Sequence, residues 1–136
     1  MKASNIFNGP QKLQCAYCGE NLLENELNSM VLIVKDKESQ IVAIKPCCKK
    51  ECDNHLRNQY LGYDTDGWRE LSDFLNPHSY MKHVMAIMNN MFKRELFANE
   101  EAFEEYKDLI LRCYPYVTRD LTDDEKSYVE WSDLRC

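Results

Sequence analysis

Four cysteines arranged as two close pairs constrain the fold of this chain more than any other feature. Cys15 and Cys18 are separated by two residues and followed by Gly19, and Cys48 and Cys52 are separated by three. Each spacing lets two thiolates chelate one ion, and glycine permits the tight backbone turn beneath the first pair. We therefore expect the two pairs to meet at one tetrahedral Cys₄ zinc site, with Zn–S bonds of about 2.3 Å.

The cysteine count and the expected compartment favour metal binding over disulfides. No apolar run approaches the roughly 20 residues that a membrane-spanning helix needs. The first 15 residues contain no stretch that resembles the apolar core of a signal peptide. We therefore expect a cytoplasmic protein with no membrane partner. Disulfides are rare in such a reducing compartment, and seven cysteines, an odd number, could not all pair within one chain.

Neighbouring residues leave the choice of ligands partly open. Cys47 could take the place of Cys48, or it could be a small buried apolar residue against a strand, and we favour Cys48 as the ligand. His55 could reach the ion if a cysteine were missing from the set, although we expect an ordinary histidine on a helix face. Cys113 and Cys136 lie far from both pairs in the sequence, so neither is expected to bind.

Two β-branched, apolar runs lie between the cysteine pairs. The runs SMVLIVKD (residues 29–36) and QIVAIK (residues 40–45) flank the polar turn KDKES (residues 35–39), and this pattern predicts a β-hairpin. A helix that begins near residue 48 would place Cys48 and Cys52 about one turn apart on the same face.

A knuckle, a hairpin and a helix that supplies the second ligand pair resemble a treble-clef zinc finger. The pattern C-x₂-C followed by C-K-K-E-C is similar to the FCS, TRASH and MYND finger families, whose second half reads aromatic-Cys-Ser-x-x-Cys at the start of a helix. The resemblance covers about residues 13–60, with Cys47 in the place of the aromatic residue and Lys49 in the place of serine. It implies one structural zinc ion held by the four matching cysteines.

The middle of the chain predicts a loop and then a helix. The segment LGYDTDGWRELS (residues 61–72) contains two glycines and is expected to be a loop. Asn76 can cap the helix that follows and Pro77 suits its first position. Apolar residues recur at helical spacing, and Met81 and Met85 widen the apolar surface. Such a surface is either core, which we favour, or an adaptable binding groove.

Two further helices are expected towards the end of the chain. The segment NEEAFEEYKDLILRCY (residues 99–114) begins with Asn99 as a cap, and Pro115 is expected to end it. In LTDDEKSYVEWSDLR (residues 121–135), Thr122 and Glu125 form a potential capping box. Trp131 is either packed on the core or part of a contact surface.

These segments predict an α+β protein. Residues 1–60 are expected to form the treble-clef-like zinc module, and residues 61–136 a helical region that packs on it. At 136 residues the two regions are expected to form one compact unit.

The chemistry of the cysteines and the net charge favour a non-enzymatic interaction protein. Four cysteines close the zinc shell, whereas a catalytic zinc keeps one open position. The net charge is −6, and residues 95–136 carry twelve Asp/Glu against five Lys/Arg. A protein partner is therefore favoured over nucleic acid. The alternative is a nucleic-acid-binding or transcription-related regulator that would use Lys45, Lys49, Lys50 and Arg57 on the finger.

Overall fold

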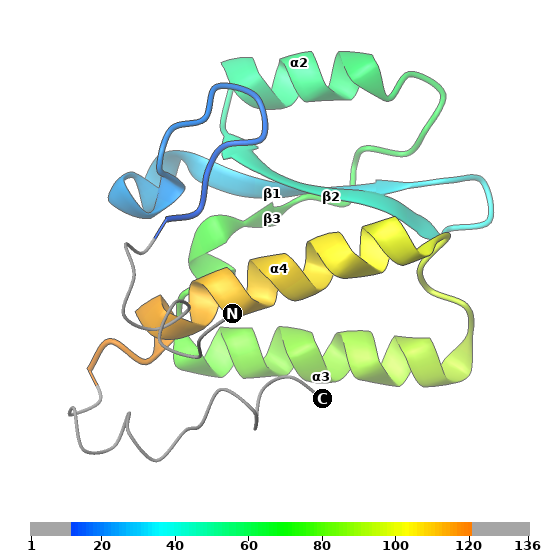
Figure 1. The fold of residues 1–136 in the computed structure, drawn as a ribbon. Coiled ribbons are helices and arrows are strands. Elements are labelled where there is room, and N and C mark those ends of the chain that lie inside the picture. The colour runs from blue at the N-terminus through cyan, green and yellow to red at the C-terminus, as the bar shows by residue number, and fades with distance from the viewer. Residues whose placement is uncertain (1–11, 121–136) are drawn as a thin grey trace.

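The computed structural model describes residues 12–120 and has the expected α+β architecture. A small antiparallel sheet lies in the middle, with α2 on one face and α4 across the other, and α3 lies alongside α4 (Figure 1). The strands are β1 (Ser29–Lys35), β2 (Ile41–Cys48) and β3 (Arg69–Glu70), in the sheet order β2-β1-β3. The helices are α2 (Glu51–Gln59), α3 (Pro77–Lys93) and α4 (Glu100–Val117), with 3₁₀ helices η1 (Leu22–Glu24), η2 (Glu26–Asn28) and η3 (Leu71–Phe74).

The predicted hairpin is confirmed as β1 and β2. Their register places Ser29 opposite Cys48, so β2 carries a cysteine at its last position. Asp36 closes the turn, because its Oδ1 accepts hydrogen bonds from the backbone N–H groups of Glu38 and Gln40, both at 3.0 Å. Strand β1 is buried along its first six residues, since helical elements cover both faces of the sheet.

A short strand and a 3₁₀ helix occupy the end of the segment that we expected to be a loop. Strand β3 extends the sheet beside β1, with Val31 opposite Arg69. Leu71 and Phe74 of η3 then turn fully into the core, with no exposed surface. The loop prediction was wrong here because a two-residue strand and a four-residue 3₁₀ helix are too short to produce a repeating hydrophobic pattern.

The N-terminus of α3 is capped as predicted. Asn76 Oδ1 accepts hydrogen bonds from the backbone N–H groups of His78 and Ser79, at 3.0 and 3.2 Å. Pro77 occupies the first turn, where a missing N–H leaves no hydrogen bond unmade.

The two sides of α3 differ sharply in burial. Tyr80 is buried and its hydroxyl donates to the backbone carbonyl of Ile110 on α4, at 2.9 Å. Met81 and Met85, by contrast, each keep 55% of their surface exposed. The favoured expectation of a helix buried on two sides is therefore wrong for the part of the protein that the structure describes. One side of α3 packs on the molecule, and the methionine side faces outward.

Helix α4 continues past the proline that was expected to end it. Pro115 lies inside the helix, which runs to Val117. The helix closes at Thr118, whose N–H and hydroxyl both donate to the carbonyl of Tyr114 at 3.0 Å. Val117 is 9% exposed, so the extra residues bury an apolar side chain that offsets the hydrogen bond lost at the proline.

Buried side chains from both halves of the described chain form one apolar cluster. Its fully buried members include Leu22, Val31, Leu32, Val34, Cys47, Leu71, Phe74, Leu109 and Cys113. Within residues 12–120, no helix combines the length and apolar character that crossing a bilayer requires. The predicted helix over residues 121–135, with its capping box and Trp131, lies outside the described residues, as does Cys136.

His83 lies in the contact between η3, α3 and α4, and we expect it to make the stability of the protein depend on pH. The His83 ring packs on Phe74 with centroids 4.5 Å apart, and its Nδ1 lies 3.3 Å from the hydroxyl of Tyr106. Burial, assisted by the positive charge of Arg69, lowers the pKa of His83, and Asp73 opposes this only weakly. Because the unfolded chain then binds a proton more readily, stability decreases as the pH falls through the ordinary histidine value of about 6.5.

We expect His83→Gln to remove this part of the pH dependence. Unfolding in urea between pH 7.5 and 5.5 should show a smaller loss of stability for the variant, by up to about 1.4 kcal/mol per pH unit. His78→Gln, at an exposed position of the same helix, is the matched control and should follow the unmodified protein. An unchanged slope in His83→Gln would contradict the assignment.

Candidate metal centre

The first cysteine pair lies in a tight turn that is fixed to the sheet. Gly19 N–H donates to the carbonyl of Cys15 at 3.0 Å, and Gly19 has φ = +82°, which glycine adopts without strain. The turn is anchored because the N–H of Ala16 donates to the carbonyl of Pro46 on β2 at 2.8 Å. Cys15 and Cys18 are thus placed beside the end of β2.

The second pair spans the junction between β2 and α2. Cys48 is the last residue of β2 and Cys52 lies in the first turn of α2. The helix therefore does not begin near residue 48, as we expected, but at Glu51. Between them Lys50 has φ = 81° and ψ = −72°, and Glu51 N–H donates to the carbonyl of Lys49 at 3.2 Å. This is a γ-turn with positive φ at its centre, a strained conformation that reverses the chain within three residues.

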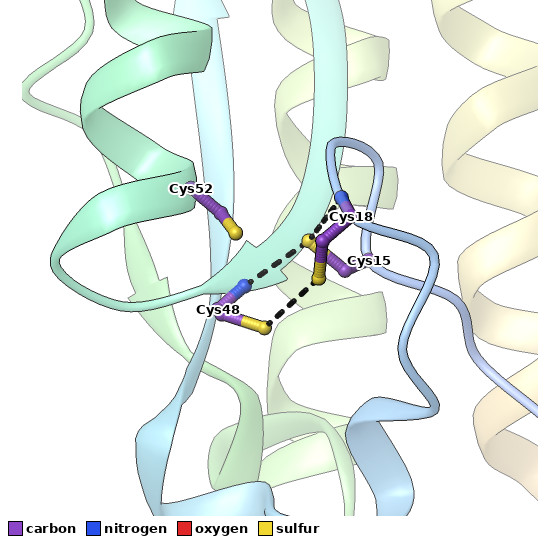
Figure 2. Close-up of side chains that lie close together, drawn as sticks. All are labelled: Cys15, Cys18, Cys48 and Cys52. Carbon is purple, nitrogen blue, oxygen red and sulfur yellow. Dashed lines mark hydrogen bonds between the residues drawn. The ribbon is translucent and has the colours of Figure 1, made fainter.

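The four sulfur atoms converge on one point, although they come from three different backbone settings. Figure 2 shows the side chains of Cys15 and Cys18 from the turn, Cys48 from the strand and Cys52 from the helix, all directed towards a common centre. Their sulfur atoms all lie within 4.8 Å of one another. The Sγ atoms of Cys18 and Cys48 are 3.7 Å apart. A tetrahedral ion with bonds of about 2.3 Å requires sulfurs about 3.8 Å apart, so the set fits zinc.

Backbone N–H groups surround the most buried of these sulfurs. The N–H groups of Tyr17, Cys18 and Cys48 point at Cys15 Sγ from 3.4, 3.5 and 3.5 Å. Burial opposes ionisation of this thiol, but the three donors outweigh burial and lower the pKa of Cys15 to about 7. With this pKa, Cys15 ionises readily to the thiolate near neutral pH, and the thiolate is the form in which cysteine binds a metal.

Two of the other thiols in the cluster have pKa values shifted in the opposite direction to that of Cys15 when no cation is present. Burial and contact with the neighbouring thiols raise the pKa of Cys48 and of Cys52. Four sulfurs this close cannot all carry negative charge unless a cation compensates them, because like charges disfavour each other's ionisation. A divalent ion supplies that compensation and deprotonates its ligating thiols. The cluster is thus complementary to a cation rather than to a set of free thiols.

The structure distinguishes the two adjacent cysteines of β2. Successive side chains of a strand point to opposite faces, so only one of Cys47 and Cys48 can reach the other pair. Cys48 joins the cluster, whereas Cys47 has no exposed surface and lies in the apolar core. Burial raises the pKa of Cys47 to about 12, as expected for an inert packing residue. Cys113 is likewise fully buried, far from the cluster on α4.

His55 is outside the cluster and makes a contact that we did not anticipate. Its ring stacks on Tyr17, with centroids 4.4 Å apart and planes inclined by 2°. Both residues are exposed. Tyr17 lies between Cys15 and Cys18 in the sequence, and His55 follows Cys52 by three positions. The sequence signal that could have predicted this contact is the closeness of each residue to a ligand, because a shared ion would bring the two segments together.

The four basic residues proposed for nucleic-acid binding do not form one free surface. Lys45 pairs with Glu105 on α4, and Lys49 pairs with Glu70 of β3. These two lysines are therefore neutralised by acidic neighbours within the protein.

The remaining two basic residues lie on the other side of the sheet or in the γ-turn. Arg57 of α2 donates to Asp53 at 3.2 Å and to the carbonyl of Thr65 at 3.1 Å. Helix α2, which carries Arg57, covers the face of the sheet opposite to α4 (Figure 1). Of the four, Lys50 is the exposed one.

Comparison with known proteins adds no relative: no protein-family model, no curated protein and no solved structure matches this chain. The geometry alone therefore identifies the site. It is a cluster of four cysteines consistent with a Cys₄ zinc site.

Proposed function

We propose that residues 13–60 form a treble-clef module around one structural zinc ion, and that the protein is a non-enzymatic, intracellular interaction protein. The observation that carries this proposal is the convergence of four cysteine sulfurs from a knuckle, a strand end and a helix start. Those are the elements of a treble clef in their usual order. The ion would be held by Cys15, Cys18, Cys48 and Cys52.

The ligand set supports a structural role for the ion. Four thiolates complete a tetrahedral shell, so water has no position at which it could be activated. Cys15 and Cys52 are buried, whereas Cys18 is exposed and Cys48 partly exposed, so the complete ligand set rather than burial is what supports a structural ion. A metal of this kind contributes its binding free energy to folding.

Charge supports a protein partner over nucleic acid. A protein that binds nucleic acid through its backbone needs several free Lys/Arg side chains on one surface. Here Lys45, Lys49 and Arg57 already pair with acidic groups, and the chain carries a net charge of −6. The alternative function, a regulator that binds nucleic acid, is distinguished from this proposal by the binding experiment described below.

Metal content is the first test of this proposal. Protein purified without chelators should contain about one equivalent of zinc per chain by elemental analysis. Zinc should remain after exhaustive dialysis and leave only with a strong chelator or acid, since thiols must be deprotonated to bind. Metal well below one equivalent would overturn the proposal.

Partner class is the second test. Binding of a random DNA duplex and of a single strand should be absent at about 50 mM and at about 200 mM salt. Affinity for either that falls steeply between the two salt concentrations would instead support the nucleic-acid-binding alternative. Affinity capture from the native host should recover a protein partner with zinc-loaded protein and not with a chelated sample. A capture that recovers nothing dependent on zinc would contradict an interaction role for the module.

A further inference from the structure

A narrow apolar stripe runs along the outward face of α3. Met81, Met85, Met88 and Phe92, which we call the methionine stripe, are 55, 55, 57 and 92% exposed. Their spacing of four, three and four residues keeps them on one line along the helix, as in the seam of two packed helices. Large apolar side chains collected on one line, unlike those scattered singly, mark a contact surface.

The stripe is separate from the side of α3 that already packs on the molecule. Tyr80 contacts α4 through its hydroxyl, and His83 contacts Phe74 and Tyr106. On a helix of 3.6 residues per turn, Tyr80 lies about 100° from the line of the stripe. The stripe therefore has no partner within residues 12–120. Helix α2, which carries Cys52, covers the face of the sheet opposite to α3 and α4 (Figure 1), so the stripe and the cysteine cluster are on different parts of the protein.

The charges beside the stripe are of one sign. Helix α3 contains Lys82 and Lys93 and no Asp or Glu. Each lysine directly follows a member of the stripe, so both lie about 100° round the helix from it, on the side opposite to Tyr80, and their long side chains can reach its edge. An apolar line bordered by lysines is complementary to a segment that combines acidic and apolar side chains.

The described chain ends next to the start of α3. Arg119 Nη1 donates to the carbonyl of Leu75 at 3.5 Å, one residue before the cap of α3. Residues 121–136 follow from that point, and even at a helical rise of 1.5 Å per residue they would span about 24 Å. The stripe covers about 16 Å by the same rise. The remaining chain is therefore long enough to cover all of it.

The composition of residues 121–136 matches what the stripe requires. The segment contains five Asp/Glu against two Lys/Arg. It also contains Leu121, Tyr128, Val129, Trp131 and Leu134 as apolar side chains.

We propose that residues 121–136 dock on the methionine stripe of α3 and shield it from solvent. The proposal rests on the exposed stripe, its lysine border, and the position, length and charge of the chain that follows Asp120. It does not depend on zinc or on the proposed function, because the stripe and the cysteine cluster are on different parts of the protein. Any external partner of the stripe would have to displace this segment.

Zero-length carbodiimide cross-linking of the full chain tests the proposal. The reagent joins lysines to carboxylates that touch, and mass spectrometry identifies the pairs. We expect Lys82 or Lys93 to be joined to an acidic residue of the segment 121–136. The Lys45–Glu105 ion pair is the internal control for reagent activity and for an intact fold. An equimolar mixture of unlabelled and ¹⁵N-labelled protein separates links within one chain from links between chains.

A charged variant shows whether the stripe itself is responsible. Met85→Glu/Met88→Glu places two carboxylates where the acidic segment would dock, and should reduce the links to residues 121–136 by about tenfold or more. Asn90→Glu, at an exposed position of α3 away from the stripe, should leave them unchanged.

Three results would overturn the proposal. The Lys45–Glu105 link could form without any link to residues 121–136. About half of the linked peptide pairs could carry one labelled and one unlabelled partner, the statistical result for links between chains, which would assign the stripe to a second copy of the protein. The double variant could retain its links in full.

Discussion

Cys48→Ser is expected to abolish stoichiometric zinc binding and to unfold the N-terminal module, whereas Cys47→Ala keeps the ion. Only Cys48 belongs to the cluster of four sulfurs. A structural zinc contributes on the order of 10 kcal/mol to folding in small finger peptides. Whole domains are stable by only about 5–15 kcal/mol. Loss of one ligand therefore removes a contribution as large as the total stability.

The adjacent position provides the matched control for this prediction. Cys47 has no exposed surface and packs in the core, so truncation to alanine should lower the free energy of unfolding by about 1 kcal/mol without releasing metal. Elemental analysis gives the zinc content, and near-ultraviolet circular dichroism reports the packing of the aromatic side chains as a whole. Full zinc content in Cys48→Ser, or zinc loss in Cys47→Ala, would contradict the ligand assignment.

The clustering of the four cysteines could be predicted from their spacing because the sequence also predicted the hairpin that lies between the two pairs. The hairpin brings the start of β1 and the end of β2 together, so the segment that precedes β1 and carries Cys15 and Cys18 returns beside Cys48 at the end of β2. The sequence analysis favoured Cys48 over Cys47 but left both open, since the strand alternation that separates them requires knowing where β2 ends. The γ-turn at Lys50 was not predictable, because lysine gives no signal for a positive φ.

The second half of the chain was less predictable for a different reason. Hydrophobic periodicity shows that a helix has apolar side chains, but not which of them another element will cover. The methionine side of α3 looked like core by this measure, yet Met81 and Met85 are exposed. The end of α4 was misplaced because the burial of Val117, a tertiary effect, outweighed the local effect of Pro115.

The segment that the sequence analysis missed, η3, is expected to be among the most sensitive parts of the fold. Leu71 has no exposed surface, and η3 contacts β1, β3, α3 and α4. Because neighbours surround it on several sides, the site cannot collapse when the side chain is shortened. Leu71→Ala should therefore lower the free energy of unfolding by about 2–5 kcal/mol.

Leu61→Ala makes the same chemical change at a position that is 79% exposed. It should change the free energy of unfolding by no more than about 0.5 kcal/mol. Both variants should be unfolded in urea at the same saturating zinc concentration, so that metal binding contributes equally to each. Equal effects of the two substitutions would mean that η3 is not packed as described. A large effect of Leu71→Ala alone would establish that a four-residue element without sequence periodicity joins the sheet to both long helices.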